Sequence, residues 1–208
     1  DPVLVTFGHL DTSAQNQAEY LERLAGICNL VGADMVLSSN ACNPAYVSGA
    51  LSRLQIPYVV NFGNHQFAGH EAWFGDPVGR IDFGPQISVL NFGHPWHVGT
   101  AQADRLLGER RAAEMKIINA FEANAPVEFF DRHKVRMIHD GHGTGTKVMD
   151  VGATPTRRIG KSSSTSFRVV RLKNNRVVTC TYDGHETAPV PFSRDESPPV
   201  ATRFLASN

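Results

Sequence analysis

The first third of the chain alternates short apolar runs with segments of helical periodicity, and this order constrains the fold more than any other feature. Apolar residues recur at helical spacing from Ser13, a predicted N-cap, to Val31, and Gly32 is expected to end that helix. A second helix is expected over residues 45–54. The intervening apolar runs predict buried strands at residues 3–6, 35–37 and 57–62. Strands that alternate with helices in this way are typical of parallel β-α-β units in an α/β fold.

Polar residues follow each of these three predicted strands. His9 and Asp11 come after the first strand, Asn40 after the second, and Asn64 and His65 after the third. In open α/β sheets the ligand crevice lies at the carboxyl ends of the strands. We therefore expect these five side chains to converge on one edge, although they lie far apart in the sequence.

The second half of the chain continues with shorter elements and an antiparallel finish. Helical periodicity predicts helices at residues 102–113 and 127–133. Apolar and β-branched runs predict strands at residues 87–92, 116–121, 135–139, 148–151, 166–172 and 176–182. Beyond Gly184 the chain is rich in proline and polar residues. We therefore expect one domain over residues 1–183 and a proline-rich C-terminal tail over residues 184–208.

Charge and composition narrow the choice of partners. The 20 basic and 20 acidic residues cancel, so no overall field favours nucleic acid or an anionic membrane. No apolar run approaches the roughly 18 residues that a membrane-spanning helix needs. Arg157, Arg158 and Lys161 form a local basic cluster, which we interpret as a solvated loop in preference to a phosphate contact. The chain begins Asp1-Pro2 without methionine, so we expect an excised or processed domain whose partners are other domains of a larger chain or a separate protein.

Several stretches share a pattern with one enzyme superfamily. The run Gly63-Asn64-His65 follows the strand predicted at residues 57–62, and the strand predicted at residues 135–139 leads into Gly141-His142. Together with the order of the predicted elements, these stretches resemble calcineurin-like metallophosphoesterases over residues 3–182. The resemblance implies two facing mixed β-sheets flanked by helices, in a four-layer sandwich. It also implies two metal ions held by five short motifs at the strand ends, of which G-N-H is intact here.

Most of the metal-ligand positions that the resemblance implies carry poor ligands. Asn40 stands where the family has the Asp that bridges both metals, and Phe7 stands at the Asp of the first motif. The His of the fourth motif falls on Ala120 or Phe121, and Thr144 replaces the second His of the last motif. A neutral amide removes a full negative charge from between two dications, and it bridges them poorly. We therefore expect no tightly held pair of metal ions.

The ligand positions that survive in this comparison carry imidazole or amide groups: His9, Asn64 and His142. Asp11 and Asn40 are weaker candidates. Because none of the surviving three is a carboxylate, we expect either no cofactor or a single divalent metal ion in a remodelled site. His65 matches the family's proton donor and would be catalytic only in an active enzyme.

Two other clusters offer alternative binding sites. Trp96 and His97 follow the strand predicted at residues 87–92 and could form a platform for a metal or a sugar, although a packed loop accounts for them more simply. The stretch 139–142 holds two histidines and an aspartate, and with His9 it suggests a smaller metal site. Histidines at strand ends are also commonly satisfied by backbone carbonyls, and we favour that interpretation.

The pattern as a whole predicts a degenerate calcineurin-like phosphoesterase domain that has lost catalysis. Such a domain would serve as a binding or structural module of a larger protein. The alternative is a metal-dependent phosphoesterase or related hydrolase, with a remodelled site that holds as few as one metal. The first is favoured because lost carboxylates are hard to replace in a metal-dependent hydrolase.

Overall fold

The computed structural model describes most of the regular elements of the chain. The described residues are 2–8, 14–41, 51–63, 78–83, 87–93, 101–108, 115–121, 123, 127–141, 147–150, 157–161, 166–173 and 176–183. The predicted tail at residues 184–208 and most of the helix predicted at residues 45–54 lie outside this set.

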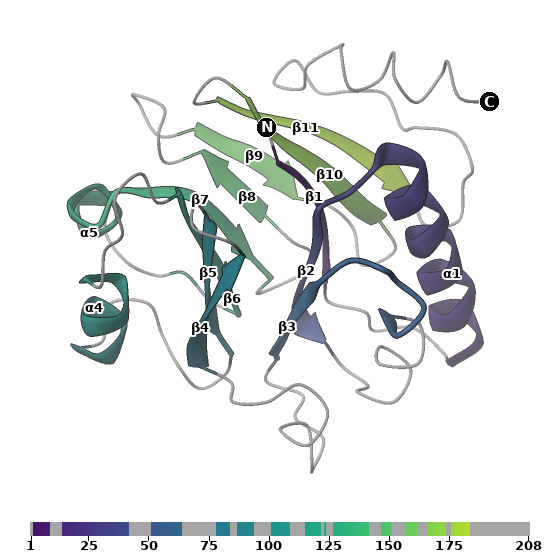
Figure 1. The fold of residues 1–208 in the computed structure, drawn as a ribbon, viewed down its shortest axis with the longest axis horizontal. Helices are drawn as coiled ribbons and strands as arrows, with labels where there is room; N and C mark the ends of the chain where they lie inside the picture. The colour runs from purple at the N-terminus through teal and green to yellow at the C-terminus, as the bar shows by residue number, and fades with distance from the viewer. Residues whose placement is uncertain are drawn as a thin grey trace.

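The described strands form two sheets that face one another (Figure 1). The first sheet has the strand order β11-β10-β1-β2-β3, in which β1, β2 and β3 run parallel and β10 and β11 are antiparallel additions. Its strands are β1 (Val3–Gly8), β2 (Met35–Ala41), β3 (Tyr58–Phe62), β10 (Ser166–Lys173) and β11 (Arg176–Asp183). Of the strands predicted at residues 148–151, 166–172 and 176–182, the last two therefore belong to this sheet.

The second sheet has the order β4-β5-β6-β7-β8-β9, with a parallel centre of β5, β6 and β7. The outer strands β4, β8 and β9 are antiparallel to their neighbours. The strands are β4 (Val78–Phe83), β5 (Ile87–Phe92), β6 (Met115–Ala120), β7 (Val135–Asp140), β8 (Lys147–Asp150) and β9 (Arg157–Lys161). Both sheets are therefore mixed, as the resemblance implied.

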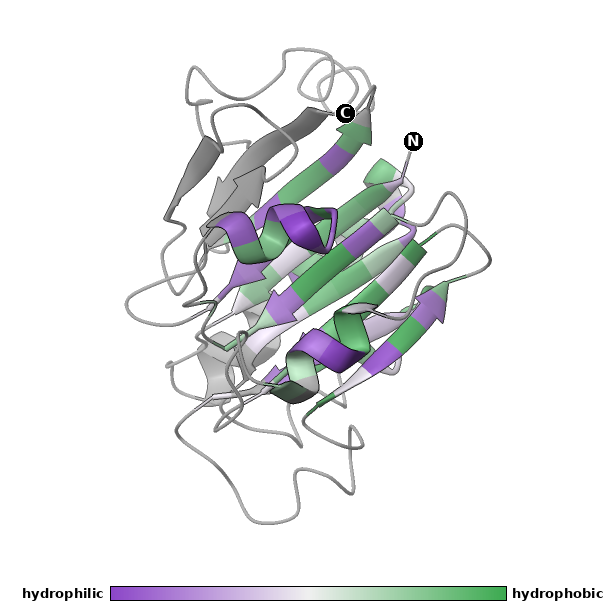
Figure 2. Cartoon of the chain, turned by 90° about the vertical axis from the view of Figure 1, so that its left-hand side faces the viewer, coloured by the Kyte–Doolittle hydropathy of each residue, from purple (hydrophilic) through white to green (hydrophobic). Residues whose placement is uncertain are grey.

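Helices cover the outer faces of the sheets, which makes four layers (Figure 1). Helix α1 (Ala14–Val31) packs Leu24, Cys28 and Val31 on the first sheet. Helices α4 (Ala101–Gly108) and α5 (Val127–Arg132) pack on the second sheet and show hydrophilic stretches beside hydrophobic ones (Figure 2). A third apolar cluster lies between the sheets. The predicted α/β fold of two facing mixed sheets flanked by helices is confirmed.

The backbone conformation at the C-terminal end of α1 explains why this boundary could be predicted from the sequence. Gly32 has a φ of 60°, in the left-handed region that glycine adopts without steric cost. The Ala33 amide then donates to the Cys28 carbonyl over 2.9 Å, which satisfies one carbonyl of the last turn. No helix among the described residues is long and apolar enough to cross a membrane.

One interpretation of the sequence was wrong. The basic residues Arg157, Arg158 and Lys161 lie in strand β9 and not in a loop, because Arg157 and Arg158 pair in register with Asp150 and Met149 of β8. Charged residues are common on outermost strands, where they discourage pairing with other chains. The basic cluster is therefore compatible with sheet structure.

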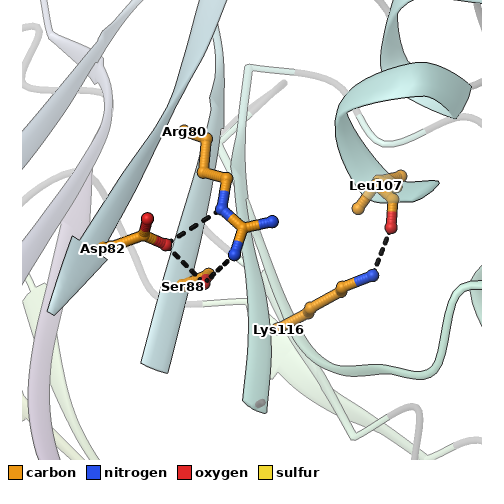
Figure 3. Close-up of polar contacts among 5 residues, drawn as sticks. All are labelled: Arg80, Asp82, Ser88, Leu107 and Lys116. Carbon is orange, nitrogen blue, oxygen red and sulfur yellow. Dashed lines mark hydrogen bonds and ion pairs between the residues drawn. The ribbon is translucent and has the colours of Figure 1, made fainter. Parts of the chain in front are cut away.

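Polar contacts stabilise the outer face of the second sheet near its outermost strand β4 (Figure 3). The Arg80 guanidinium donates to Asp82 Oδ1 over 2.9 Å and to Ser88 Oγ over 2.9 Å, and Ser88 Oγ donates to Asp82 over 2.7 Å. The buried Lys116 ammonium donates to the Leu107 carbonyl in the last turn of α4. A cation at this end of a helix is favourable because the unsatisfied carbonyls carry partial negative charge. These contacts tie β4 to β5 and α4 to β6.

Candidate functional site

The carboxyl ends of the parallel strands from both sheets meet at one edge, which we call the carboxyl edge. Near the end of β6, the side-chain amide nitrogen of Asn119 donates to the Ser38 carbonyl of β2 over 2.9 Å. Near the end of β5, the side-chain amide nitrogen of Asn91 donates to the Val60 carbonyl of β3 over 3.0 Å. Because β1 is parallel to β2, and β7 to β6, all six parallel strands end on this side.

The faces that the two sheets turn toward each other change character along their length. Away from the carboxyl edge they are apolar, and Val89, Ile117 and Met137 pack there against the first sheet. Two residues further along each strand, the side chain on the same face is polar. The buried polar residues at these positions are Thr6, Ser39, Asn61, Asn91, Asn119 and His139. A buried polar layer therefore lies just beneath the carboxyl edge.

Three of these side chains form a continuous chain of hydrogen bonds, the Asn–Asn–His ladder of Asn91, Asn119 and His139. They are neighbours in register on β5, β6 and β7. The Asn119 amide nitrogen lies 2.9 Å from Asn91 Oδ1, and Asn119 Oδ1 lies 2.8 Å from His139 Nδ1. With the bonds from Asn91 and Asn119 to the first sheet, the ladder joins the two sheets.

The ladder determines which imidazole nitrogen of His139 carries the proton. Asn119 uses its amide nitrogen as the donor to both Ser38 and Asn91, so its Oδ1 must accept from His139. His139 Nδ1 is therefore protonated and Nε2 carries a lone pair. Burial first, and the positive charge of Arg168 second, lower the pKa of His139 to about 3. The imidazole is consequently neutral at physiological pH.

Thr6 Oγ1, Ser39 Oγ and His139 Nε2 are among the atoms of the polar layer for which the structure shows no hydrogen-bond partner. All three residues are fully buried. Buried polar atoms are nearly always paired, so such exceptions require an explanation. Their location beneath the carboxyl edge marks this region as the candidate functional site.

Gly141, directly after β7, brings the ends of the two sheets into contact. A Cβ at this position would lie 1.6 Å from Ser39 Oγ and 3.0 Å from the Ser39 carbonyl carbon. The Gly141 amide also donates to the Ala120 carbonyl of β6 over 3.1 Å. Only glycine allows β2 and β7 to approach this closely.

The candidate residues named from the sequence lie mainly beyond the described ranges. They are His9, Asp11, Asn64, His65, Trp96, His97 and His142. The backbone of Asn40 belongs to β2, but its side chain is outside the described set. These assignments remain predictions. The structure does describe Gly8, Gly63 and Gly141, which directly precede three of them.

The smaller metal site suggested at residues 139–142 cannot include both His139 and Asp140. His139 faces the opposite sheet, and by strand alternation Asp140 points to the other face of β7. The two side chains cannot converge on one ion. Within the described ranges, no three His, Cys, Asp or Glu side chains cluster in a way that could hold a metal.

The sequence missed the Asn–Asn–His ladder. Asn91 and Asn119 were placed within predicted strands and given no role, and His139 was considered only for a small metal site. The signal was present, because each is a polar residue two positions after an apolar residue near the end of a strand. Only the register between β5, β6 and β7 shows that the three are adjacent.

Comparison with known proteins yields likeness in fold only. No family model matches the chain, and no curated protein matches it. The solved structures of similar fold include GAP50, described as the anchor in the inner membrane complex of Plasmodium. It shares 11% identity at a TM-score of 0.56, over 99% of this chain and 94% of that one. They also include a double mutant of the amidase from Nesterenkonia sp. AN1 in complex with acrylamide, with 10% identity and a TM-score of 0.50, over 83% of this chain and 91% of that one.

These comparisons contradict the function predicted from the sequence. The solved structures of similar fold are described as a membrane-complex anchor and an amidase, and not as calcineurin-like phosphoesterases. The degenerate phosphoesterase module and the alternative metal-dependent phosphoesterase are therefore both set aside. One fold hosts many chemistries, so short motifs at strand ends were insufficient to identify an activity. The resemblance to the superfamily itself stays a prediction.

Cys28 does not offer a nucleophile for thiol chemistry. Its thiol is buried beneath α1, and this burial raises its pKa to about 12. At pH 8 only about one such thiol in ten thousand would be ionised. The thiolate is the reactive form, so Cys28 serves as part of the apolar core.

We expect Cys28 to resist iodoacetamide at pH 8 while the protein is folded, because the reagent needs an exposed thiolate. Peptide mass spectrometry would follow the modification over an hour. The same reaction in concentrated urea should modify Cys28 completely and provides the control. Stoichiometric labelling of the folded protein within minutes would show that this thiol is neither buried nor inert.

Proposed function

We propose that the protein binds a single divalent transition-metal ion at its carboxyl edge. The observation that carries this proposal is the contact between Ser39 and Gly141, which brings the ends of strands from both sheets together. The described strand ends Gly8, Gly63 and Gly141 are each followed immediately in the sequence by a nitrogen or amide donor. The proposed ligands are accordingly His9, Asn64 and His142, with Asp11 and Asn40 as secondary candidates.

The donor types support one transition-metal ion in preference to a pair of ions or to Mg²⁺ or Ca²⁺. Imidazole suits zinc, copper, nickel and iron, whereas Mg²⁺ and Ca²⁺ are held by several carboxylate and carbonyl oxygens. Three protein ligands and one open position also form a common zinc geometry. A pair of dications would need a bridging carboxylate, and Asn40 occupies that place in the sequence.

We propose that the partner of this chain is another protein or a further domain. The balanced charge of 20 basic and 20 acidic residues argues against nucleic acid, because phosphate contacts need a basic surface. Ile81 supports an apolar protein contact, since it is 39% exposed on the outermost strand β4. Salt-independent binding of a protein partner would be consistent with this contact.

Elemental analysis tests the metal proposal directly. The purified chain is incubated with Zn²⁺, Mn²⁺, Fe²⁺ or Ca²⁺ and then desalted. We expect about one equivalent of a transition metal and little calcium, because the proposed donors are mainly imidazole nitrogens. His142→Ala and His9→Ala should each reduce the retained metal at least about tenfold.

His133→Ala is the matched control for the metal measurement. This residue precedes β7, at the end of the strand opposite the carboxyl edge, and its Nε2 lies 2.6 Å from Asp104 on α4. Its replacement should leave the metal content unchanged. Less than about a tenth of an equivalent in the unmodified chain would refute the proposal, as would equal loss in all three variants.

A further inference from the structure

The Asn–Asn–His ladder has one direction of donation from end to end. His139 Nδ1 donates to Asn119, Asn119 donates to Asn91, and Asn91 donates to the Val60 carbonyl of the first sheet. A branch from Asn119 reaches the Ser38 carbonyl of the same sheet. Hydrogen bonds in such a chain polarise one another, so the strength of one depends on the next.

We infer that the Asn–Asn–His ladder is an acid-sensitive latch that holds the carboxyl ends of the two sheets together. The latch is closed when His139 is neutral. When His139 gains a second proton, the contacts from Asn119 to Ser38 and from Asn91 to Val60 are released. This inference does not depend on metal binding, because no ladder residue is a proposed ligand.

The surroundings of His139 explain why a second proton opens the latch. That proton would reside on Nε2, a fully buried atom for which the structure shows no partner. The side chain of Asn119 offers no negative charge on the β6 side, and Val148 is the opposing residue on β8. On the facing sheet, Ser39 is neutral and the buried Arg168 of β10 carries a positive charge. Asp140 points to the other face of β7 and does not compensate.

The sign of the pH effect follows from the two protonation states. The pKa of His139 is lowered to about 3 in the closed state, from an ordinary value of 6.5 in an exposed state. Above about pH 6.5 both states are neutral and the latch is fully effective. Between about pH 6.5 and pH 3 the open or unfolded state binds a proton that the closed state does not. Acid therefore favours opening throughout this range.

Urea unfolding of the full chain at several pH values provides the first test. From pH 6 downward we expect the unfolding equilibrium constant to rise by up to about tenfold per pH unit through this histidine. His139→Asn should flatten this dependence, because the asparagine amide keeps a donor at the position of Nδ1 but does not titrate. His133→Asn, the matched control on the outer face, should retain the dependence. An unchanged acid response in His139→Asn would overturn the inference.

A second measurement on the unmodified chain applies even if His139→Asn does not fold. Hydrogen exchange at pH 7.5 and pH 5, corrected for intrinsic exchange rates, would map where protection is lost first. We expect peptides from β2 and β6 near the carboxyl edge to lose protection before those of α1. Imidazole nitrogen NMR should show His139 neutral in the closed state at pH 5. Uniform loss of protection, or a charged His139 in the folded protein at that pH, would refute the latch.

Discussion

Replacing Asn119 with alanine is expected to lower the free energy of unfolding by about 4 kcal/mol, because three buried polar groups each lose a partner at about 1–3 kcal/mol apiece. These groups are His139 Nδ1, Asn91 Oδ1 and the Ser38 carbonyl. None of them can reach water without separating the sheets, since all lie in the buried layer. The loss should therefore exceed that of an ordinary truncation of a polar side chain.

Urea denaturation at pH 7.5 would measure this change, with Asn29→Ala as the matched control. Asn29 lies exposed on α1, so its replacement should alter stability by no more than about 0.5 kcal/mol. Asn119→Asp separates the two roles of the ladder residue, because aspartate keeps the acceptor for His139 and loses the donors. It should be destabilised at least as much as Asn119→Ala, because a carboxylate oxygen would face the Ser38 carbonyl and Asn91 Oδ1, which are both acceptors. A loss below about 1 kcal/mol for Asn119→Ala would mean that the ladder contributes little to joining the sheets.

Local periodicity was sufficient to predict most of the fold, because the elements themselves are regular. The α1 helix begins and ends within a residue of the predicted bounds, and Gly32 ends it in the expected conformation. The strands at the centre of both sheets were also predicted, since buried parallel strands are nearly continuous apolar runs. Strand β9 was missed because its five residues include three basic ones and a glycine, a composition that resembles a loop.

The candidate site was less predictable, because it depends on contacts between distant strands. The expectation that His9, Asp11 and Asn64 meet at one edge stays a prediction, because these residues lie outside the described ranges. The ladder beneath that edge depends on the pairing of β5, β6 and β7, and on how the second sheet is placed against Ser38 and Val60. Neither relation is encoded within a short window of sequence. The motifs of the family resemblance fall on residues that follow the strands, whereas the ladder residues lie just inside the strands.

Replacing Gly141 is expected to cause the second large loss of stability, through steric overlap with Ser39. Replacing it with alanine places a Cβ 1.6 Å from Ser39 Oγ, 2.8 Å from Ser39 Cβ and 3.0 Å from the Ser39 carbonyl carbon. The hydroxyl could rotate away, but the Cβ and the backbone carbon cannot move without shifting β2. Overpacking of this kind costs about 1–3 kcal/mol, so we expect a loss of about 3 kcal/mol in the free energy of unfolding.

A double-mutant cycle would show whether that loss comes from the contact between β2 and β7. Ser39→Gly removes the hydroxyl and the Cβ, so Gly141→Ala should cost much less in this background, with a coupling of about 1–2 kcal/mol. Gly26→Ala is the control for the glycine substitution itself. Gly26 lies within α1 with open space around its Cβ position, so alanine there should raise stability by about 0.5–1 kcal/mol. If Ser39→Gly gives no rescue, the two sheets do not meet at Gly141 as closely as the structure shows, and the carboxyl edge would then be more open than the metal proposal requires.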